Sequence, residues 1–157
     1  KYLGHDKVYV LDGGLEAYKE AGGEISTENT KSTKGNLNIN VKENMKVDME
    51  YVKERINNEK IALVDSREYQ RYIGEFEPVD KKAGHIPGAL NFFWMDILKK
   101  VDDKYYLKSL KELKKQFSNL KNYDEVIVYC GSGITACPNS LALSEAGNYM
   151  LVVLVIG

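Results

Sequence analysis

The chain has few cysteines, almost no net charge and no long apolar run, and each of these absences excludes a class of protein. Its 157 residues include only two cysteines, Cys130 and Cys137, which does not fit the disulfide framework of a small secreted protein. Its 22 basic and 23 acidic residues nearly balance, which argues against binding nucleic acid or an anionic membrane through bulk charge. The apolar run at 150–157 is too short to span a bilayer and predicts a buried strand instead.

Motifs for common metal and cofactor sites are also missing. The two histidines and two cysteines are not spaced in a zinc-binding pattern. The glycine-rich signatures of phosphate-binding and dinucleotide-binding loops do not occur either. We therefore expect a protein of about one domain's length that works without a metal or a cofactor.

The most informative feature that is present is a strand, a loop and a helix around Cys130. Residues 126–129 read VIVY, a β-branched and aromatic run that is typical of a buried parallel strand. Gly131 and Gly133 then give the loop backbone its freedom, and a helical pattern starts at about Ala136. Cys130 is therefore expected at the carboxyl end of a strand, where open α/β sheets bind their ligands.

This position predicts a reactive sulfur. The N–H groups of a loop and the positive end of a helix both stabilise negative charge, so we expect Cys130 to react as a thiolate. The same surroundings would stabilise an anionic persulfide or an oxyanion such as sulfite. The alternative is a buried cysteine with a purely structural role at the end of the strand. Ser132 and Thr135, in the same loop, favour the reactive interpretation.

The rest of the chain predicts an α/β fold with a small parallel sheet and helices on both faces. Near the N-terminus we expect a strand at 8–11 and a helix at 15–21, followed by a linker at 25–45 that is rich in Ser, Thr, Asn and Lys. A second unit starts near Lys46, with Asp48 as the N-cap of its first helix. Beyond that helix, strands are predicted at 61–64, 126–129 and 151–156, a short strand after GHIPGALN at 84–91, and helical segments at 68–72, 95–100, 109–117 and from 136 onward.

Two stretches of this second unit resemble a known family. CGSGITA at 130–136 is similar to the active-site loop of rhodanese-type sulfurtransferases, in particular the two-domain thiosulfate and 3-mercaptopyruvate enzymes. DSREYQRYIGEFEPVDKKAGHIPGALNFFW at 65–94 resembles the second hallmark of the bacterial members, with Phe93 in place of the proline before Trp94. The resemblance implies that the α/β unit is a rhodanese-like domain.

The beginning of the chain resembles the end of another such domain. VYVLDGGLEAYKEAG at 8–22 is similar to the last strand and helix of a rhodanese domain, with Tyr18 where the family pattern has tryptophan. The resemblance implies that residues 1–24 are the remnant of a first rhodanese-like domain, that 25–45 are a linker, and that 46–157 are the catalytic domain.

The resemblance also implies roles for individual residues. Cys130 would carry sulfur as a persulfide, the Ser132 hydroxyl would relay a proton to substrate, and the Arg71 guanidinium would bind the anion of the donor. The other substrate-binding residues would be those of the loop, namely Gly131, Gly133, Ile134 and Thr135.

The sequence does not specify which sulfur donor the enzyme would use. Mercaptopyruvate enzymes usually carry a second arginine before the GHIPG sequence, and residues 75–83 contain none. Lys81 or Lys82 could supply a point charge there, although without the paired donors of a guanidinium. This departure leaves thiosulfate or another sulfur donor open.

Four further side chains have both a functional and a structural interpretation. His85 is either a base or part of the packing of the GHIPG turn, and Asp65 either bonds the loop or pairs structurally with Arg67. Trp94 is either a wall of the pocket or a core aromatic residue. Cys137 is either a packed small hydrophobic residue or a resolving thiol for an oxidised Cys130.

Three functions are compatible with these residues. The first is a sulfurtransferase that moves a sulfane sulfur from thiosulfate or 3-mercaptopyruvate, through a Cys130 persulfide, to cyanide, a thiol or a protein acceptor. The second is a cysteine phosphatase or arsenate reductase of the same fold, but such enzymes place an arginine six positions after the cysteine, where this chain has Ala136. The third is a non-catalytic binding or regulatory module, although such modules typically lack the cysteine.

The expected partners follow from the sulfurtransferase interpretation. They are a small sulfur-donor anion, a thiophilic acceptor and the N-terminal rhodanese domain of the same protein. We expect neither nucleic acid nor a membrane as a partner, and we expect a cytoplasmic protein.

Overall fold

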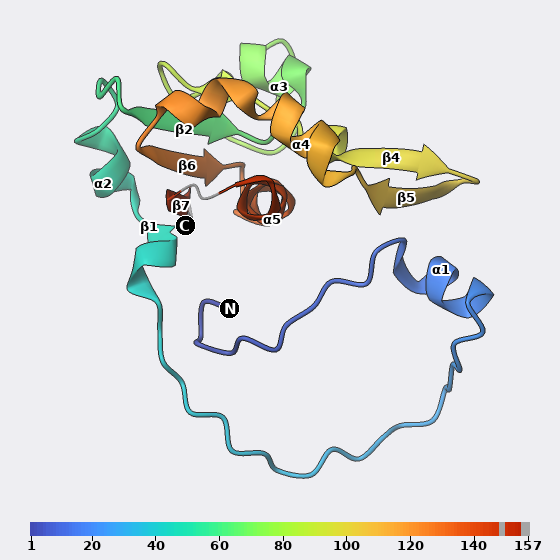
Figure 1. Ribbon diagram of the computed structural model, residues 1–157. Helices are drawn as coiled ribbons and strands as arrows, with labels where there is room; N and C mark the ends of the chain where they lie inside the picture. The colour runs from blue at the N-terminus through green and yellow to red at the C-terminus, as the bar shows by residue number, and fades with distance from the viewer. Residues whose placement is uncertain (148–149, 155–157) are drawn as a thin grey trace. The chain divides into compact units, whose positions relative to one another are not determined.

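The computed structural model describes residues 1–147 and 150–154, and the contacts within the chain define two units (Figure 1). One unit comprises residues 1–43 together with 98–107. The other comprises residues 44–97 together with 108–157 and contains Cys130. The second unit begins close to Lys46, where the sequence predicts a new unit, but residues 98–107 leave it to join the first.

A parallel sheet of five strands forms the centre of the second unit. The strand order is β1-β7-β6-β2-β3, and every neighbouring pair is parallel. This arrangement confirms the predicted α/β class with a small parallel sheet. The strands are β1 (Lys46–Val47), β2 (Ile61–Asp65), β3 (Leu90–Asn91), β6 (Glu125–Tyr129) and β7 (Met150–Leu154).

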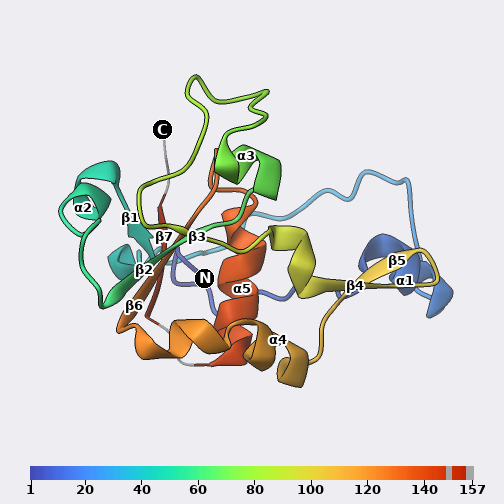
Figure 2. The ribbon, with the colours of Figure 1, turned by 90° about the horizontal axis from the view of Figure 1, so that it is seen from above.

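Helices cover both faces of this sheet, as the alternation of elements predicts. Figure 2 shows α2 on one side of the sheet and α4 and α5 on the other. The Asp48 side chain caps α2 by accepting a hydrogen bond from the Tyr51 N–H at 2.9 Å, and Ser109 and Glu112 form the predicted capping box of α4. The bounds are α2 Met49–Lys53, α3 Tyr69–Ile73, α4 Leu110–Gln116 and α5 Ala136–Ala146, with 3₁₀ turns at Glu43–Met45, Trp94–Ile97 and Ser118–Asn122.

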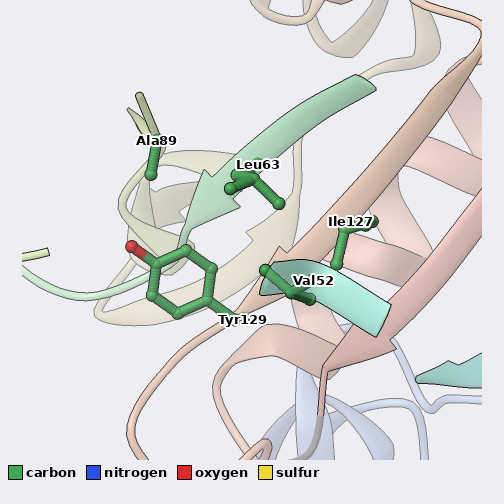
Figure 3. Packing of buried hydrophobic residues seen from close by; sticks show 5 residues of the cluster. All are labelled: Val52, Leu63, Ala89, Ile127 and Tyr129. Atoms are coloured by element: carbon green, nitrogen blue, oxygen red, sulfur yellow. The ribbon is translucent and has the colours of Figure 1, made fainter. Parts of the chain in front are cut away.

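The core lies on both sides of the central strands β2 and β6. On the face covered by α2, Val52 packs against a cluster that Figure 3 shows, namely Leu63, Ala89, Ile127 and Tyr129. Side chains alternate along a strand, so the neighbouring residues of β2 and β6 face the opposite side, where α5 packs. Those residues, Ala62, Val64, Val126 and Val128, are also buried. Burial on both faces holds the carboxyl ends of these two strands in place.

The register of β2 and β6 places the ends of these two strands, which are far apart in the sequence, at the same edge of the sheet. Asp65 pairs with Tyr129, so both strands end at the same edge of the sheet. The ladder continues one step further, because the Ser66 N–H donates to the Tyr129 carbonyl at 2.9 Å. The DSR segment and Cys130 therefore leave the sheet side by side.

The first unit contains one helix and an antiparallel hairpin. The helix is α1 (Gly14–Glu20), and the hairpin consists of β4 (Leu98–Val101) and β5 (Lys104–Leu107). Its turn, Asp102–Asp103, has φ values of 45° and 62°, in the left-handed region that aspartate tolerates better than most residues. An ion pair of 2.7 Å joins Lys104 to Glu20 at the end of α1.

Two sequence predictions are wrong in this unit. Residues 8–11 form no strand, and Tyr9 and Val10 are 88% and 71% exposed, because the described residues offer them no strand partner. Residues 95–100 are not a helix, since a 3₁₀ turn ends at Ile97 and β4 follows. The β4–β5 hairpin was not predicted. Of the predicted last strand, 151–154 are confirmed, and 155–156 lie outside the described residues.

No helix in the described part of the chain combines the length and the apolar character needed to cross a membrane.

Candidate functional site

Cys130 lies where the sequence predicts it, immediately after β6 at the carboxyl edge of the parallel sheet. Only 2% of the residue is exposed. Residues 131–135 form a short loop, and α5 begins at Ala136 with Thr135 as its N-cap. The cysteine therefore faces a loop that leads directly into the positive end of an eleven-residue helix.

One backbone N–H of the loop is aimed at the sulfur. Gly133 donates a hydrogen bond to Cys130 Sγ at 3.0 Å. Its φ is 84°, a left-handed conformation that glycine adopts without the penalty of a side chain. A main-chain N–H in this position stabilises negative charge on a thiolate or on a persulfide. The Gly133 N–H thus faces the sulfur, and its role in binding substrate stays a prediction.

The other predicted loop residues differ in their exposure. Ser132 is exposed, and Ile134 is 74% exposed, while Gly131 and Thr135 are partly buried. Neither the Ser132 hydroxyl nor the Thr135 hydroxyl forms a hydrogen bond within the described residues. The loop therefore presents both hydroxyl groups and one apolar side chain beyond the buried sulfur.

Arg71 lies next to this loop, although it is 59 positions away in the sequence. A Cβ atom placed on Gly131 would lie 3.6 Å from Arg71 Nη2 and 3.4 Å from Asp80 Oδ1. A guanidinium and a carboxylate therefore lie close to the residue that follows Cys130. The arginine that is predicted to bind the anion thus lies near the loop, and an unpredicted aspartate accompanies it.

Five side chains form a continuous arginine–carboxylate cluster behind this contact: Asp65, Arg67, Arg71, Glu77 and Asp80. Three carboxylates face two guanidinium groups, so the cluster carries one net negative charge when all five are ionised. We call Asp65 and Arg67 its inner half, and Arg71 and Asp80 its outer half. Glu77 belongs to both halves.

Glu77 is the centre of the cluster. Its carboxylate accepts from Arg71 Nη2 at 2.7 Å, from Arg67 Nη1 at 3.2 Å, and from the backbone N–H groups of Val79 and Asp80 at 3.0 and 2.9 Å. The hydrogen bond from Arg71 is the main reason that the pKa of Glu77 is lowered to about 2. Glu77 is therefore ionised throughout the physiological range and fixes both arginines.

The two side chains of the inner half are buried and form hydrogen bonds with each other and with neighbouring groups. Arg67 Nη2 lies 2.6 Å from Asp65 Oδ2 and donates to the Gly84 carbonyl at the same distance. The side chains of Arg67 and Asp65 are 6% and 0% exposed. The hydrogen bond to Asp65 raises the pKa of Arg67 above its ordinary value. This geometry supports the structural interpretation of Asp65.

His85 packs on Tyr72. Its ring stacks on Tyr72 with centroids 3.8 Å apart, and its Nδ1 lies 2.7 Å from the Tyr72 carbonyl oxygen. The next residue, Ile86, donates its N–H to the Tyr129 hydroxyl at 3.1 Å. These contacts dock the GHIPG turn on β6, which supports the structural interpretation of the histidine.

Trp94 is held near the DSR segment. Its backbone N–H donates to the Ser66 carbonyl at 3.1 Å, and its indole ring packs edge to face against the Phe93 ring. The same serine is bonded by Asn139 of α5, whose Nδ2 lies 2.9 Å from Ser66 Oγ. Trp94 is partly buried, and these contacts do not place it against Cys130.

Cys137 is exposed, so the prediction of a packed hydrophobic residue is wrong. It occupies the second position of α5, and its Sγ contacts the Gly133 carbonyl at 3.3 Å. Its neighbours Ala136 and Asn139 in the first turn of α5 are buried, so Cys137 lies on the opposite, exposed side of the helix.

Sequence reasoning missed Glu77 and Asp80 as site residues. Both belong to the EPVD part of the recognised stretch, six and nine positions after Arg71. That spacing in a proline-containing, non-helical segment was the available signal, because such a segment can fold back onto the arginine. Only the folded loop shows that it does.

Away from Cys130, the described residues contain a cavity but no cluster of metal-binding side chains. A cavity of about 510 Å³ lies elsewhere in the unit and contains none of the predicted site residues; its lining is Asn91, Phe92, Asp96, Lys108, Glu112, Lys115 and Gln116. Among the residues that the structure describes, no three His, Cys, Asp or Glu side chains are arranged to hold a metal ion. We therefore take Cys130 and the adjoining cluster as the candidate site.

Comparisons with known proteins agree with this location. The family model of the Rhodanese-like domain matches residues 48–157. A probable 3-mercaptopyruvate sulfurtransferase of Pseudomonas aeruginosa is 38% identical over 145 residues, which cover 90% of this chain and 50% of that protein. Thiosulfate sulfurtransferase of Mus musculus is 31% identical over 152 residues, covering 94% of this chain and 50% of that protein. The chain thus spans about half the length of the curated relatives it matches.

Solved structures give the same fold. The 3-mercaptopyruvate sulfurtransferase SseA from Escherichia coli matches with a TM-score of 0.81 and 26% identity, over 98% of this chain and 57% of that one. EanB in complex with ergothioneine matches with a TM-score of 0.84 and 24% identity, over 98% of this chain and 39% of that one. The second likeness bears on the fold alone.

Proposed function

Because the chain belongs to the rhodanese family, we propose that the protein is a sulfurtransferase in which Cys130 carries sulfur as a persulfide. The observation that carries the proposal is the Gly133 N–H aimed at Cys130 Sγ at 3.0 Å, at the carboxyl edge of a parallel sheet. Arg71, in contact distance of the neighbouring Gly131, provides the cation that a small anionic donor requires.

The first half of the proposed reaction loads the cysteine. The Cys130 thiolate attacks the outer sulfur of thiosulfate, the sulfur–sulfur bond of the donor breaks, and sulfite leaves with the electron pair. The product is a Cys130 persulfide, and the Gly133 N–H stabilises its negative charge. With 3-mercaptopyruvate the carbon–sulfur bond breaks instead, and pyruvate leaves as its enolate, which must gain a proton.

The second half unloads the cysteine. A thiophilic acceptor, such as cyanide, a thiol or a protein cysteine, attacks the outer sulfur of the persulfide. The Cys130 thiolate is released, and the sulfur leaves on the acceptor. Because the donor's product departs before the acceptor binds, we expect ping-pong kinetics.

We favour thiosulfate as the donor, because its reaction needs a cation but no proton relay. Arg71 is the one guanidinium of the outer half, and Lys81 and Lys82 are exposed in the same segment. A mercaptopyruvate reaction would also need the Ser132 hydroxyl, exposed in the loop, to relay a proton to the enolate. Thiosulfate needs no such proton, so its turnover places fewer demands on the residues present.

We extend the proposal to a preceding rhodanese-like domain as a partner of this site. Two observations support it: the curated relatives are about twice as long as this chain, and residues 8–22 resemble the end of such a domain. In this proposal the preceding domain would contribute residues to the substrate pocket.

Intact-mass measurement tests the proposal. The chain is incubated with thiosulfate, desalted and weighed, and then weighed again after cyanide. We expect a gain of one sulfur atom that cyanide removes, and no gain in Cys130→Ser. Cys137→Ser is the matched control and is expected to load sulfur as the parent does.

The absence of a gain is interpreted with a longer chain. The same measurement is made on a chain extended at its N-terminus by a rhodanese-like domain. Loading there alone would support a role for that domain, and failure in both chains would contradict the persulfide mechanism.

A further inference from the structure

Asp80 is a carboxylate of the arginine–carboxylate cluster that lies beside the reactive loop, next to Arg71. Its Oδ2 accepts from Arg71 Nη2 at 2.9 Å and from Arg67 Nη1 at 3.3 Å. Its Oδ1 lies 3.4 Å from the position of a Cβ on Gly131. A carboxylate therefore lies beside the proposed anion-binding cation, and both groups are close to the residue next to Cys130.

Some N–H groups of the Arg71 guanidinium already donate to carboxylates, and others have no such partner among the described residues. A guanidinium offers a side-on pair, Nε with one Nη, and an end-on pair, the two Nη groups. Glu77 takes the side-on pair, with Nε at 3.1 Å and Nη2 at 2.7 Å. Asp80 takes the second hydrogen of Nη2, which is one half of the end-on pair. An incoming anion can therefore use the end-on pair only if Asp80 releases Nη2.

The two carboxylates that hold Arg71 differ in their freedom to move. The Glu77 side chain is 4% exposed and also accepts two backbone N–H groups. The Asp80 side chain is 34% exposed, and within the described residues it accepts hydrogen bonds from the two arginines. Rotation of Asp80 into solvent leaves its charge hydrated, whereas Glu77 has no such route.

We propose that Asp80 is a resident counter-anion of Arg71, which the anionic group of the sulfur donor displaces. This inference rests on the proposed function, because it takes Arg71 as the donor's binding residue. With Asp80 in place the cluster carries a net negative charge, and without it the cluster is neutral. Asp80 therefore determines how strongly the site prefers a neutral reagent over an anionic one.

A pair of alkylating reagents tests this without requiring sulfur transfer. Iodoacetate is an anion and iodoacetamide is neutral, and both react with a thiolate by losing iodide. The ratio of their rate constants at Cys130 therefore reports the selectivity of the site for charge. The measurements use Cys137→Ser as the parent chain, so that Cys130 is the only cysteine present.

In this parent, Asp80→Asn is expected to raise the iodoacetate-to-iodoacetamide rate ratio about fivefold, the effect of a partly exposed charge. Asparagine keeps an oxygen that can accept from Arg71 Nη2, so the arginine stays in place. Asp80→Glu, which keeps the charge, is expected to restore most of the parent's ratio. The control is Glu75→Gln, which removes one charge from an exposed residue of the same segment and is expected to leave the ratio unchanged.

An unchanged ratio in a folded Asp80→Asn chain would overturn the proposal, and so would equal changes in both rates, which indicate a structural role. Should Asp80→Asn fail to fold, Asp80→Ser gives the same comparison. The persulfide mechanism can fail in the mass measurement while this ratio still shifts, so the two failures are distinguishable. Where sulfur loading is observed, KM for thiosulfate is expected to fall about tenfold in Asp80→Asn, with kcat nearly constant.

Discussion

The two halves of the arginine–carboxylate cluster contain the same chemical groups in opposite situations. Arg67 in the inner half is 6% exposed and is held by a carboxylate with no exposure. Arg71 in the outer half is 18% exposed, and besides the buried Glu77 it is held by Asp80, which is 34% exposed. Asp80 lies nearer to Arg71, at 2.9 Å, than to Arg67, at 3.3 Å. We therefore expect the outer arginine rather than the inner one to bind a ligand, because one of its counter-ions can move into solvent.

The largest effect, on the free energy of unfolding, is expected from removing the ion pair between Arg67 and Asp65 in the inner half. Arg67→Met leaves the Asp65 carboxylate buried without its cation, which should cost about 3–5 kcal/mol in the free energy of unfolding. Chemical denaturation followed by circular dichroism measures it. The control is Lys53→Met, which removes an exposed ion pair with Glu50 and should cost less than about 1 kcal/mol. A small loss in Arg67→Met would remove the distinction between the halves.

The outer half is expected to affect activity more than stability. Arg71→Lys keeps the charge but loses the planar pair of donors, so kcat/KM for thiosulfate should fall about tenfold to hundredfold. The free energy of unfolding should change by less than half as much as in Arg67→Met. Arg55→Lys, away from the loop, is the control. Equal activity in Arg71→Lys and the parent would show that Arg71 does not bind the donor.

Glu77 belongs to both halves, and its effect is expected in acid. Its pKa is lowered from the ordinary 4.5 to about 2 in the folded chain, so its ionised form stabilises the fold above pH 4.5. That stabilisation is lost as the pH falls from 4.5 towards 2. Glu77→Gln should therefore flatten the loss of unfolding free energy over this interval, measured by denaturation at several pH values. The exposed Glu59→Gln should keep the parent's slope, and an equal slope in Glu77→Gln would contradict the assignment.

The smallest effect is expected outside the cluster, at His85. Phenylalanine can keep the stack on Tyr72 while losing the Nδ1 contact to the Tyr72 carbonyl. We expect His85→Phe to cost about 1 kcal/mol in stability and to change kcat less than about twofold. Steady-state rates with thiosulfate and cyanide measure this. A tenfold loss of kcat in a stable variant would instead make His85 part of the chemistry.

The Cys130 region could be predicted because its signals are local. A β-branched run, two loop glycines and a helical pattern each specify a backbone conformation within a few residues, and the structure has all three in order. The carboxyl edge of a parallel sheet then follows from topology rather than from long-range packing. Arg71 was added by resemblance, since nothing near it in sequence points to Cys130.

The features that the sequence did not predict depend on tertiary contacts, which local sequence patterns do not specify. Residues 8–11 have high strand propensity, but a strand also needs a neighbouring strand, and the described residues provide none. Residues 104–107 form a strand because the Asp102–Asp103 turn folds them back onto 98–101. Glu77 and Asp80 join the cluster only because the 75–83 segment folds back onto the arginines, which brings Asp80 close to Gly131.

The hydrogen bond from the Ser66 N–H to the Tyr129 carbonyl has an evolutionary consequence. It joins the segment that carries Arg67 and Arg71 to the segment that carries Cys130 through main-chain atoms. Substitution of side chains leaves these atoms in place. We therefore expect the relative position of the two segments to persist in relatives whose side chains around them differ.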